Sequence, residues 1–162
     1  MIPIIKTLPQ KKLIGKRMNM SLTHGKTPEL FKSFMPRKKE ISSSVGNDVF
    51  CMRVYDPSYD FKNFDPSASF DKWAAVEVIN TDVIPSEMES YLLPGGLYAV
   101  FTYKGSSKDT SPFQFIFGTW LPNEKEYELD NRPHFEILGE KYKNNDLNSE
   151  EEIWIPVKLK FY

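Results

Sequence analysis

The sequence contains one cysteine, Cys51, and two histidines, His24 and His134, among its 162 residues. One cysteine cannot form an internal disulfide, and a zinc site built from several cysteines is excluded as well. Neither histidine belongs to an HExxH or EF-hand pattern. We therefore expect no metal and no cofactor, and Cys51 in "VFCMRVY" is interpreted as a buried strand residue.

Long hydrophobic runs and an excess of charge of one sign are also lacking. No stretch of about 18 apolar residues occurs, and the N-terminal segment lacks the apolar region and cleavage site of a secretory signal. The formal net charge is −1 with 27% charged residues, so no overall field attracts nucleic acid or an anionic membrane. We expect a cytoplasmic protein with no membrane partner and no direct contact with nucleic acid.

Aromatic residues, in contrast, are abundant. They make up 14% of the chain, with 12 Phe, 8 Tyr and 3 Trp. A chain of this length forms one domain with a substantial core. We expect some of these rings to line a pocket instead of filling that core.

Two segments of the chain begin a helix in the same way. "KTPELFKSFMP" has Thr27 as a candidate N-cap before Pro28, and "DTSPFQFIFGTWLP" has Ser111 before Pro112. Each predicted helix follows one strand and precedes two others, so the order strand–helix–strand–strand occurs twice. The predicted strands are 11–22, 49–56 and 72–79 around the helix at 26–36, and 95–105, 133–138 and 152–161 around the helix at 109–122.

This repeat predicts an α+β fold made by duplication of one unit. The segment "NTDVIPSEMESYLLPGG" joins the two copies, and no flexible linker separates them. We therefore expect a single domain over residues 1–162, with halves of about 1–82 and 83–162.

The strand "HFEILG" carries a glutamate, Glu136, between apolar neighbours. Because side chains alternate along a strand, Glu136 and Leu138 share one face, and Glu152 and Trp154 share a face of the last strand. If the two strands are neighbours, these four residues line one surface. That surface is either the solvated side of the sheet or a pocket for a bulky, flat cation, with aromatic walls and carboxylates at its base.

The order "LPGGLYAVFTYKG", a helix ending "GTWLP", "EYELDNRPHFEI" and "EIWIPVK" resembles the GyrI-like family over about residues 90–158. This family is the small-molecule-binding domain of many AraC-type and multidrug-sensing bacterial regulators, and it also occurs alone. The first half resembles it more loosely. The resemblance implies a pseudo-twofold α+β domain, with a curved antiparallel sheet, helices across it and a cleft at the pseudosymmetry axis.

In the family, a glutamate of the "P-x-F-E" strand lies at the bottom of the cleft, and Glu136 matches it. Glu152 and Trp154 match an acid and an aromatic residue that approach ligands in some members. Leu138 departs from the pattern, because many relatives have an aromatic residue there. The chain also begins in its first strand without the helix-turn-helix domain that many relatives carry.

The resemblance implies a stand-alone protein that binds a hydrophobic or cationic small molecule and passes the signal to a partner regulator. One alternative is a hydrolase of reactive small molecules, with Glu136 and Glu152 as the general base and its partner. Another is a protein-interaction module like a gyrase inhibitor. No nucleophile–base pair stands out, which favours binding over catalysis. The candidate ligand-binding residues are Glu136, Leu138, Glu152, Trp154, Phe101, Tyr103, Trp120, Tyr127 and Tyr55.

Overall fold

Two helices begin at the Thr-Pro and Ser-Pro pairs, as the sequence predicts. They are α1 (Thr27–Phe34) and α2 (Ser111–Phe115), each with its proline in the first turn. Thr27 and Ser111 are the first helical residues instead of the N-caps. A short π-helical turn, η3 (Ile116–Trp120), continues α2 into α3 (Leu121–Asn123).

The computed structural model describes residues 1–161, and in this range nine strands form one antiparallel sheet. Along the sheet the order is β1-β6-β9-β8-β3-β4-β2-β5, and β7 pairs with β9. The strands are β1 (Ile4–Leu8), β2 (Lys11–Met20), β3 (Val49–Val54), β4 (Phe70–Val78), β5 (Glu89–Leu93), β6 (Gly96–Lys104), β7 (Tyr127–Leu129), β8 (His134–Leu138) and β9 (Glu150–Leu159). Two short 3-10 helices, η1 (Met35–Glu40) and η2 (Phe61–Asn63), lie in the connections.

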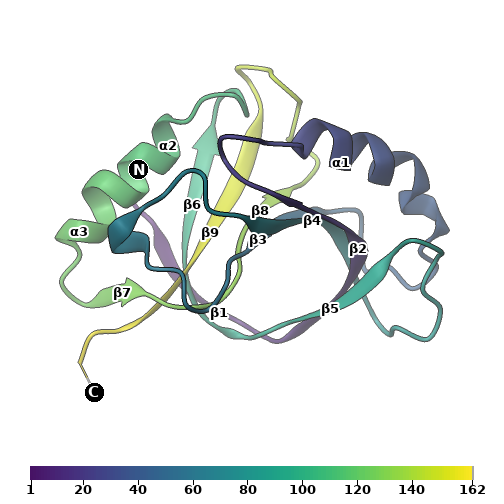
Figure 1. Ribbon diagram of the computed structural model, residues 1–162, viewed down its shortest axis with the longest axis horizontal. Coiled ribbons are helices and arrows are strands. Elements are labelled where there is room, and N and C mark those ends of the chain that lie inside the picture. Colours follow the sequence, from purple (N-terminus) through teal and green to yellow (C-terminus); the bar gives the residue numbers. More distant parts are fainter. Residues whose placement is uncertain (162) are drawn as a thin grey trace.

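The predicted duplication is visible in the order of the elements. The first copy is β2–α1–β3–β4 and the second is β6–α2–β8–β9. The strands β3 and β8, one from each copy, pair in the middle of the sheet (Figure 1). The α+β class and the curved antiparallel sheet are thus confirmed.

The outermost strands β1 and β5 lie in segments that the sequence did not predict as strands. The N-terminal β1 pairs with β6 of the second copy, and β5, from the segment between the copies, pairs with β2 of the first. Each is only five residues long. The two copies are therefore bound together at both ends of the sheet as well as at its centre.

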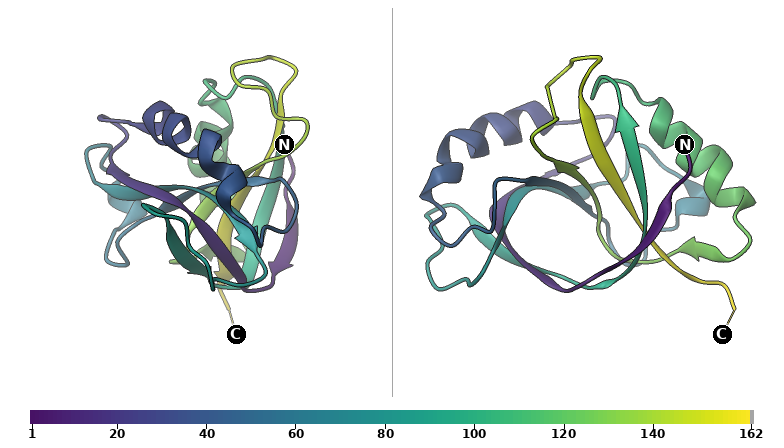
Figure 2. Two further views of the ribbon diagram at one scale, coloured as in Figure 1. Left: turned by 90° about the vertical axis from the view of Figure 1, so that its right-hand side faces the viewer. Right: turned by 180° about the vertical axis from the view of Figure 1, so that it is seen from behind.

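Both helices cover the same face of the sheet, one over each copy (Figures 1 and 2). Leu30 and Phe34 of α1 pack on Ile14 and Val76, and Ile116 packs on Phe101 beneath the other helix. A third cluster, which includes Tyr98 and Trp154, fills the opposite face where the sheet curves. The middle of the helix-covered face, over β3 and β8, thus lies between two separate cores. No helix in residues 1–161 has both the length and the apolar character needed to cross a membrane.

Candidate functional site

Glu136 lies at the centre of the sheet, in the gap between the two helices. Its cross-strand partners are Cys51 of β3 and Ile153 of β9. Directly opposed residues of an antiparallel pair share a face, and Ile153 belongs to the core beneath α2. The carboxylate therefore points to the helix-covered side, where its side chain is 15% exposed.

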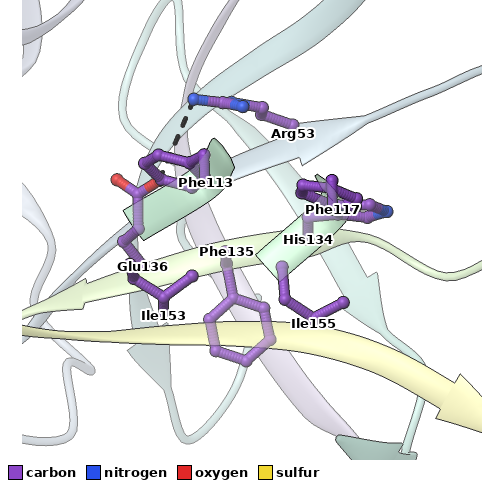
Figure 3. Close-up of a pocket in the computed structure, with 8 residues that line it drawn as sticks. All are labelled: Arg53, Phe113, Phe117, His134, Phe135, Glu136, Ile153 and Ile155. Atoms are coloured by element: carbon purple, nitrogen blue, oxygen red, sulfur yellow. Dashed lines mark ion pairs between the residues drawn. The ribbon is translucent and has the colours of Figure 1, made fainter. Parts of the chain in front are cut away.

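The side chains around Glu136 form a hollow that we call the central cleft. Phe113 and Phe117 of the second helix lie over it, as Figure 3 shows. These rings leave a volume of only about 10 Å³, which is close to the minimum for one water molecule. The cleft is thus formed but nearly closed. It is lined by Arg53, Phe113, Phe117, His134, Phe135, Glu136, Ile153 and Ile155.

An ion pair crosses this cleft from one copy of the unit to the other. Nη2 of Arg53 in β3 lies 3.9 Å from Oε1 of Glu136 in β8 (Figure 3). The Cζ atom of the same guanidinium group lies 5.2 Å from the ring centre of Phe113 and 5.9 Å from that of Phe70. Burial is the largest single influence and opposes the charge, but the Glu136 carboxylate, together with smaller contributions from Tyr55 and Cys51, outweighs it, and the pKa of Arg53 is raised.

Two more ionisable groups share this face of the sheet and are almost fully buried. Lys72 of β4 is 4% exposed and Glu151 of β9 is 9% exposed. Burial, followed by the charge of Glu136, raises the pKa of the Glu151 carboxyl to about 7. A side chain that titrates near neutral pH therefore lies beside the central cleft.

A group of parallel rings separates the central cleft from a larger cavity. Phe61 of η2 stacks on His134 with ring centres 5.1 Å apart, and Phe117 lies 6.0 Å from both rings. Burial, followed by the charge of Arg53, lowers the pKa of His134 to about 3, so this ring is neutral. Because His134 lines both spaces, it is the wall between them.

Beyond this wall lies a space of about 180 Å³ that we call the side cavity. Its rings come from Tyr55, Phe61, Tyr91 and His134, and prolines complete the wall. At its edge, Arg132 stacks on Tyr98, with Cζ 4.7 Å from the ring centre. The full lining is Val54, Tyr55, Asp56, Pro57, Phe61, Tyr91, Pro94, Asp130, Asn131, Arg132, Pro133 and His134.

The surface predicted to join Glu136 with Glu152 and Trp154 does not exist. Ile137, not Glu136, lies opposite Glu152, and Phe135 lies opposite Trp154. Trp154 therefore packs in the core on the other face of the sheet, stacked on Phe135 with ring centres 5.3 Å apart. Its Nε1–H donates to Oε1 of Glu152 at 3.1 Å. The acid of β9 that shares the face of Glu136 is Glu151.

The other predicted residues lie around the site but serve different contacts. Leu138 packs at the edge of the core beneath α1, and Phe101 is fully buried beneath Trp120, whose ring is 5.2 Å away. The hydroxyl group of Tyr103 donates a hydrogen bond to Oδ2 of Asp109 at 2.7 Å, just before α2 begins. Tyr55 lines the side cavity. Tyr127 lies in β7, opposite Leu159, and packs against the core beneath α2.

Several residues of the central cleft were missed from the sequence. Phe113 and Phe117 are not among the predicted ligand-binding residues, yet they line the cleft as well as packing against the core beneath α2. The sequence could have indicated Arg53, because a charged side chain in the apolar strand "VFCMRV" needs either a buried partner or contact with solvent. Within residues 1–161, no group of His, Cys, Asp or Glu side chains is arranged to hold a metal ion.

The fold and the central cleft define a class of α+β domain. Comparison with known proteins identifies the family within this class. Residues 4–157 match the sequence model of the Cass2 family, described as integron-associated effector binding protein. The chain belongs to this family, and the resemblance to GyrI-like effector-binding domains is confirmed.

Among curated proteins, the transcriptional regulator BrlR of Pseudomonas aeruginosa is 28% identical over 131 residues. The match includes 80% of this chain but 45% of BrlR, so the chain spans less than half the length of that relative.

Two solved structures show the same fold. One is SAV2435 bound to tetraphenylphosphonium, with a TM-score of 0.63 and 16% identity over 98% of this chain and 94% of that one. The other is the integron cassette protein VCH_CASS2 from the mobile metagenome of Vibrio cholerae, with a TM-score of 0.63 and 17% identity over 96% and 95%.

Proposed function

We propose that this effector-binding domain binds a bulky hydrophobic cation in the central cleft, with Glu136 as the counter-charge. The observation that carries the proposal is the position of Glu136. Its carboxylate lies at the junction of the two copies, beneath Phe113 and Phe117, and is 15% exposed. Aromatic faces attract a cation, and a sheltered carboxylate adds charge complementarity that bulk water screens only weakly.

The likeness in fold to SAV2435, whose structure holds tetraphenylphosphonium, supports this class of ligand. The relationship to BrlR supports the further proposal that a transcription regulator responds to the bound ligand. These relatives suggest the kind of ligand, whereas the residues that would bind it are argued from this chain's own cleft.

Binding requires the cleft to open. Pockets for drug-sized ligands have volumes of about 300–1,000 Å³, whereas the central cleft has about 10 Å³ and the side cavity about 180 Å³. Moving Phe61 away from His134 would allow the His134 ring, which separates the two spaces, to shift, and a shift of Phe113 and Phe117 would widen the cleft. The irregular π-helical turn η3, which contains Phe117, is a suitable place for such a shift.

Titration calorimetry with tetraphenylphosphonium tests the proposal. The wild-type protein should show saturable binding, and Glu136→Gln should weaken it about tenfold or more, because the variant keeps the shape but removes the charge. Glu152→Gln is the matched control, since it makes the same change on the opposite face of the sheet. Absence of saturable binding, or equal losses in both variants, would contradict the proposal.

A further inference from the structure

The guanidinium group of Arg53 occupies the place that a cationic ligand of the central cleft would need. One of its nitrogens lies 3.9 Å from the Glu136 carboxylate, and its Cζ atom lies 5.2 Å from the ring centre of Phe113. The ring of Phe70 is 5.9 Å away on another side. A carboxylate together with aromatic faces makes a binding site for a cation, and here a side chain of the protein uses it.

The polar contacts of Arg53 in this site are nevertheless incomplete. The 3.9 Å separation from Glu136 exceeds the usual 2.7–3.2 Å of a hydrogen bond. Its Nε atom is buried, and no residue within 1–161 accepts a hydrogen bond from it. Buried donors without partners are uncommon and unfavourable. Leaving the cleft would release this nitrogen to water, and the side chain is already 23% exposed.

We propose that Arg53 is a specificity-determining residue, an internal cation that competes with the ligand for Glu136. The inference rests on the proposed function, because it presumes that Glu136 binds a cation. To bind, a ligand must gain more free energy from the carboxylate and the rings than Arg53 loses when its side chain leaves the cleft. A small hydrated cation gains little from aromatic faces and is excluded, whereas a monocation with a large apolar surface displaces the side chain.

The neighbouring charges restrict the ligand further. Lys72 remains buried on the same face, and a displaced Arg53 stays charged near the mouth of the cleft. A ligand with two positive charges would face both cations, with Glu136 and Glu151 as the acids available to balance them. The cleft should therefore prefer a single charge spread over a bulky aromatic body.

The test compares the wild-type protein with Arg53→Met, which keeps an unbranched apolar side chain and removes the charge. Two probes of nearly equal size and opposite charge, the cation tetraphenylphosphonium and the anion tetraphenylborate, are titrated in sodium buffer. We expect Arg53→Met to bind tetraphenylphosphonium about tenfold more tightly than the wild type. Its affinity for tetraphenylborate should not rise. The control is Arg17→Met, since Arg17 forms ion pairs with Asp71 and Glu89 on the exposed part of β2.

The double variant Arg53→Met/Glu136→Gln shows whether the two side chains act together. Its affinity for tetraphenylphosphonium should match that of Glu136→Gln, because competition for an absent carboxylate has no effect. A thermal melt confirms that each variant is folded. If Arg53→Met fails to fold, Arg53→Gln takes its place, and we expect the same tighter binding of tetraphenylphosphonium.

The outcomes separate the two proposals. If the wild type binds tetraphenylphosphonium through Glu136 and removing the Arg53 charge brings no gain, Arg53 is not a competitor, while the proposed function stands. If the wild type prefers tetraphenylborate and Arg53→Met loses that binding, Arg53 recruits anions and both proposals are overturned. If neither probe binds any of these proteins, the proposed function fails and the inference fails with it.

Discussion

The ring of Phe61 stacks on that of His134, with centres 5.1 Å apart and planes 18° from parallel. Phe61 belongs to the short helix η2 in the long connection between β3 and β4, whereas His134 begins the central strand β8. A loop of the first copy therefore packs against the His134 ring that separates the central cleft from the side cavity. We therefore expect entry to the central cleft to depend on the position of this loop ring.

Removing the Phe61 ring should make the site easier to enter. In Phe61→Ala we expect the association rate of tetraphenylphosphonium to rise about threefold or more, because binding no longer waits for this ring to move. Stopped-flow fluorescence measures the rate. Phe64→Ala is the control in the same loop, since Phe64 is 56% exposed. A slower or unchanged association rate in Phe61→Ala would show that the ring does not obstruct entry.

The buried His134 should make the protein less stable in acid. Its pKa in the fold is about 3, whereas an unfolded histidine titrates near 6.5. Below about pH 6.5 His134 binds a proton in the unfolded chain but not in the fold, so the contribution of His134 to the free energy of unfolding falls as pH decreases. Between pH 7 and 5 this loss amounts to roughly 1–2 kcal/mol.

Urea denaturation at pH 7 and pH 5 tests this expectation. His134→Phe keeps a flat ring between Phe61 and Phe117 and should lose less stability over this interval than the wild type. His24→Gln changes the other histidine, which is exposed, and should behave like the wild type. Equal losses in His134→Phe and the wild type would refute the assignment of this acid sensitivity to His134.

Gly15 is required where β2 pairs with β4, opposite Ala75. A Cβ atom at this position would lie 2.1 Å from the carbonyl oxygen of Ala74 and 2.7 Å from Cβ of Ala75. Gly15→Ala should therefore lower the free energy of unfolding by about 1–3 kcal/mol through overpacking. Gly118→Ala is the control, because nothing lies within 4 Å of its added methyl group, and it should be neutral or raise stability by up to about 1 kcal/mol. Chemical denaturation distinguishes the two variants, and similar effects of both would contradict this account.

The repeated unit could be predicted because its signals are local. Proline in the first helical turn and apolar residues at helical spacing set α1 and α2, and the strands around them are long and apolar. The edge strands β1 and β5 could not be predicted in this way. Their side chains are mostly exposed, so no apolar alternation marks them, and the pairing that makes them strands joins distant parts of the chain.

The site shows the same division between local and long-range information. Alternation correctly placed Glu136 apart from Phe135, because both lie in one strand. It could not show which side chains of β9 share that face, since this depends on the register between strands. A shift of one residue in the register exchanges the two faces. Because the register could not be predicted, Glu152 and Trp154 were expected to line the site, whereas Glu151 and Ile153 share the face of Glu136. Arg53 was missed because its partner lies in the other half of the chain.

Glu151 should couple the stability of the fold to pH in the opposite direction from His134. Its pKa in the fold is about 7, above the value of about 4.3 for an unfolded glutamate. Between these values Glu151 binds a proton in the fold but not in the unfolded chain, so the contribution of Glu151 to stability falls as pH rises from about 4 to 7 and then levels off. Glu151→Gln should therefore be more stable than the wild type at pH 8, by roughly 1–3 kcal/mol, with a smaller difference near pH 5.

The same carboxyl should make binding of a cation depend on pH. Burial and the charge of Glu136 raise the pKa of Glu151, and a cation placed beside Glu136 favours the ionised form and releases a proton. The affinity for tetraphenylphosphonium should consequently increase from pH 6 to pH 8 in the wild type, and this increase should be smaller in Glu151→Gln. Titrations in buffers of different ionisation enthalpy measure the released proton directly. Glu152→Gln keeps Glu151 and should retain the dependence, whereas an equal increase in Glu151→Gln would assign the proton to another group.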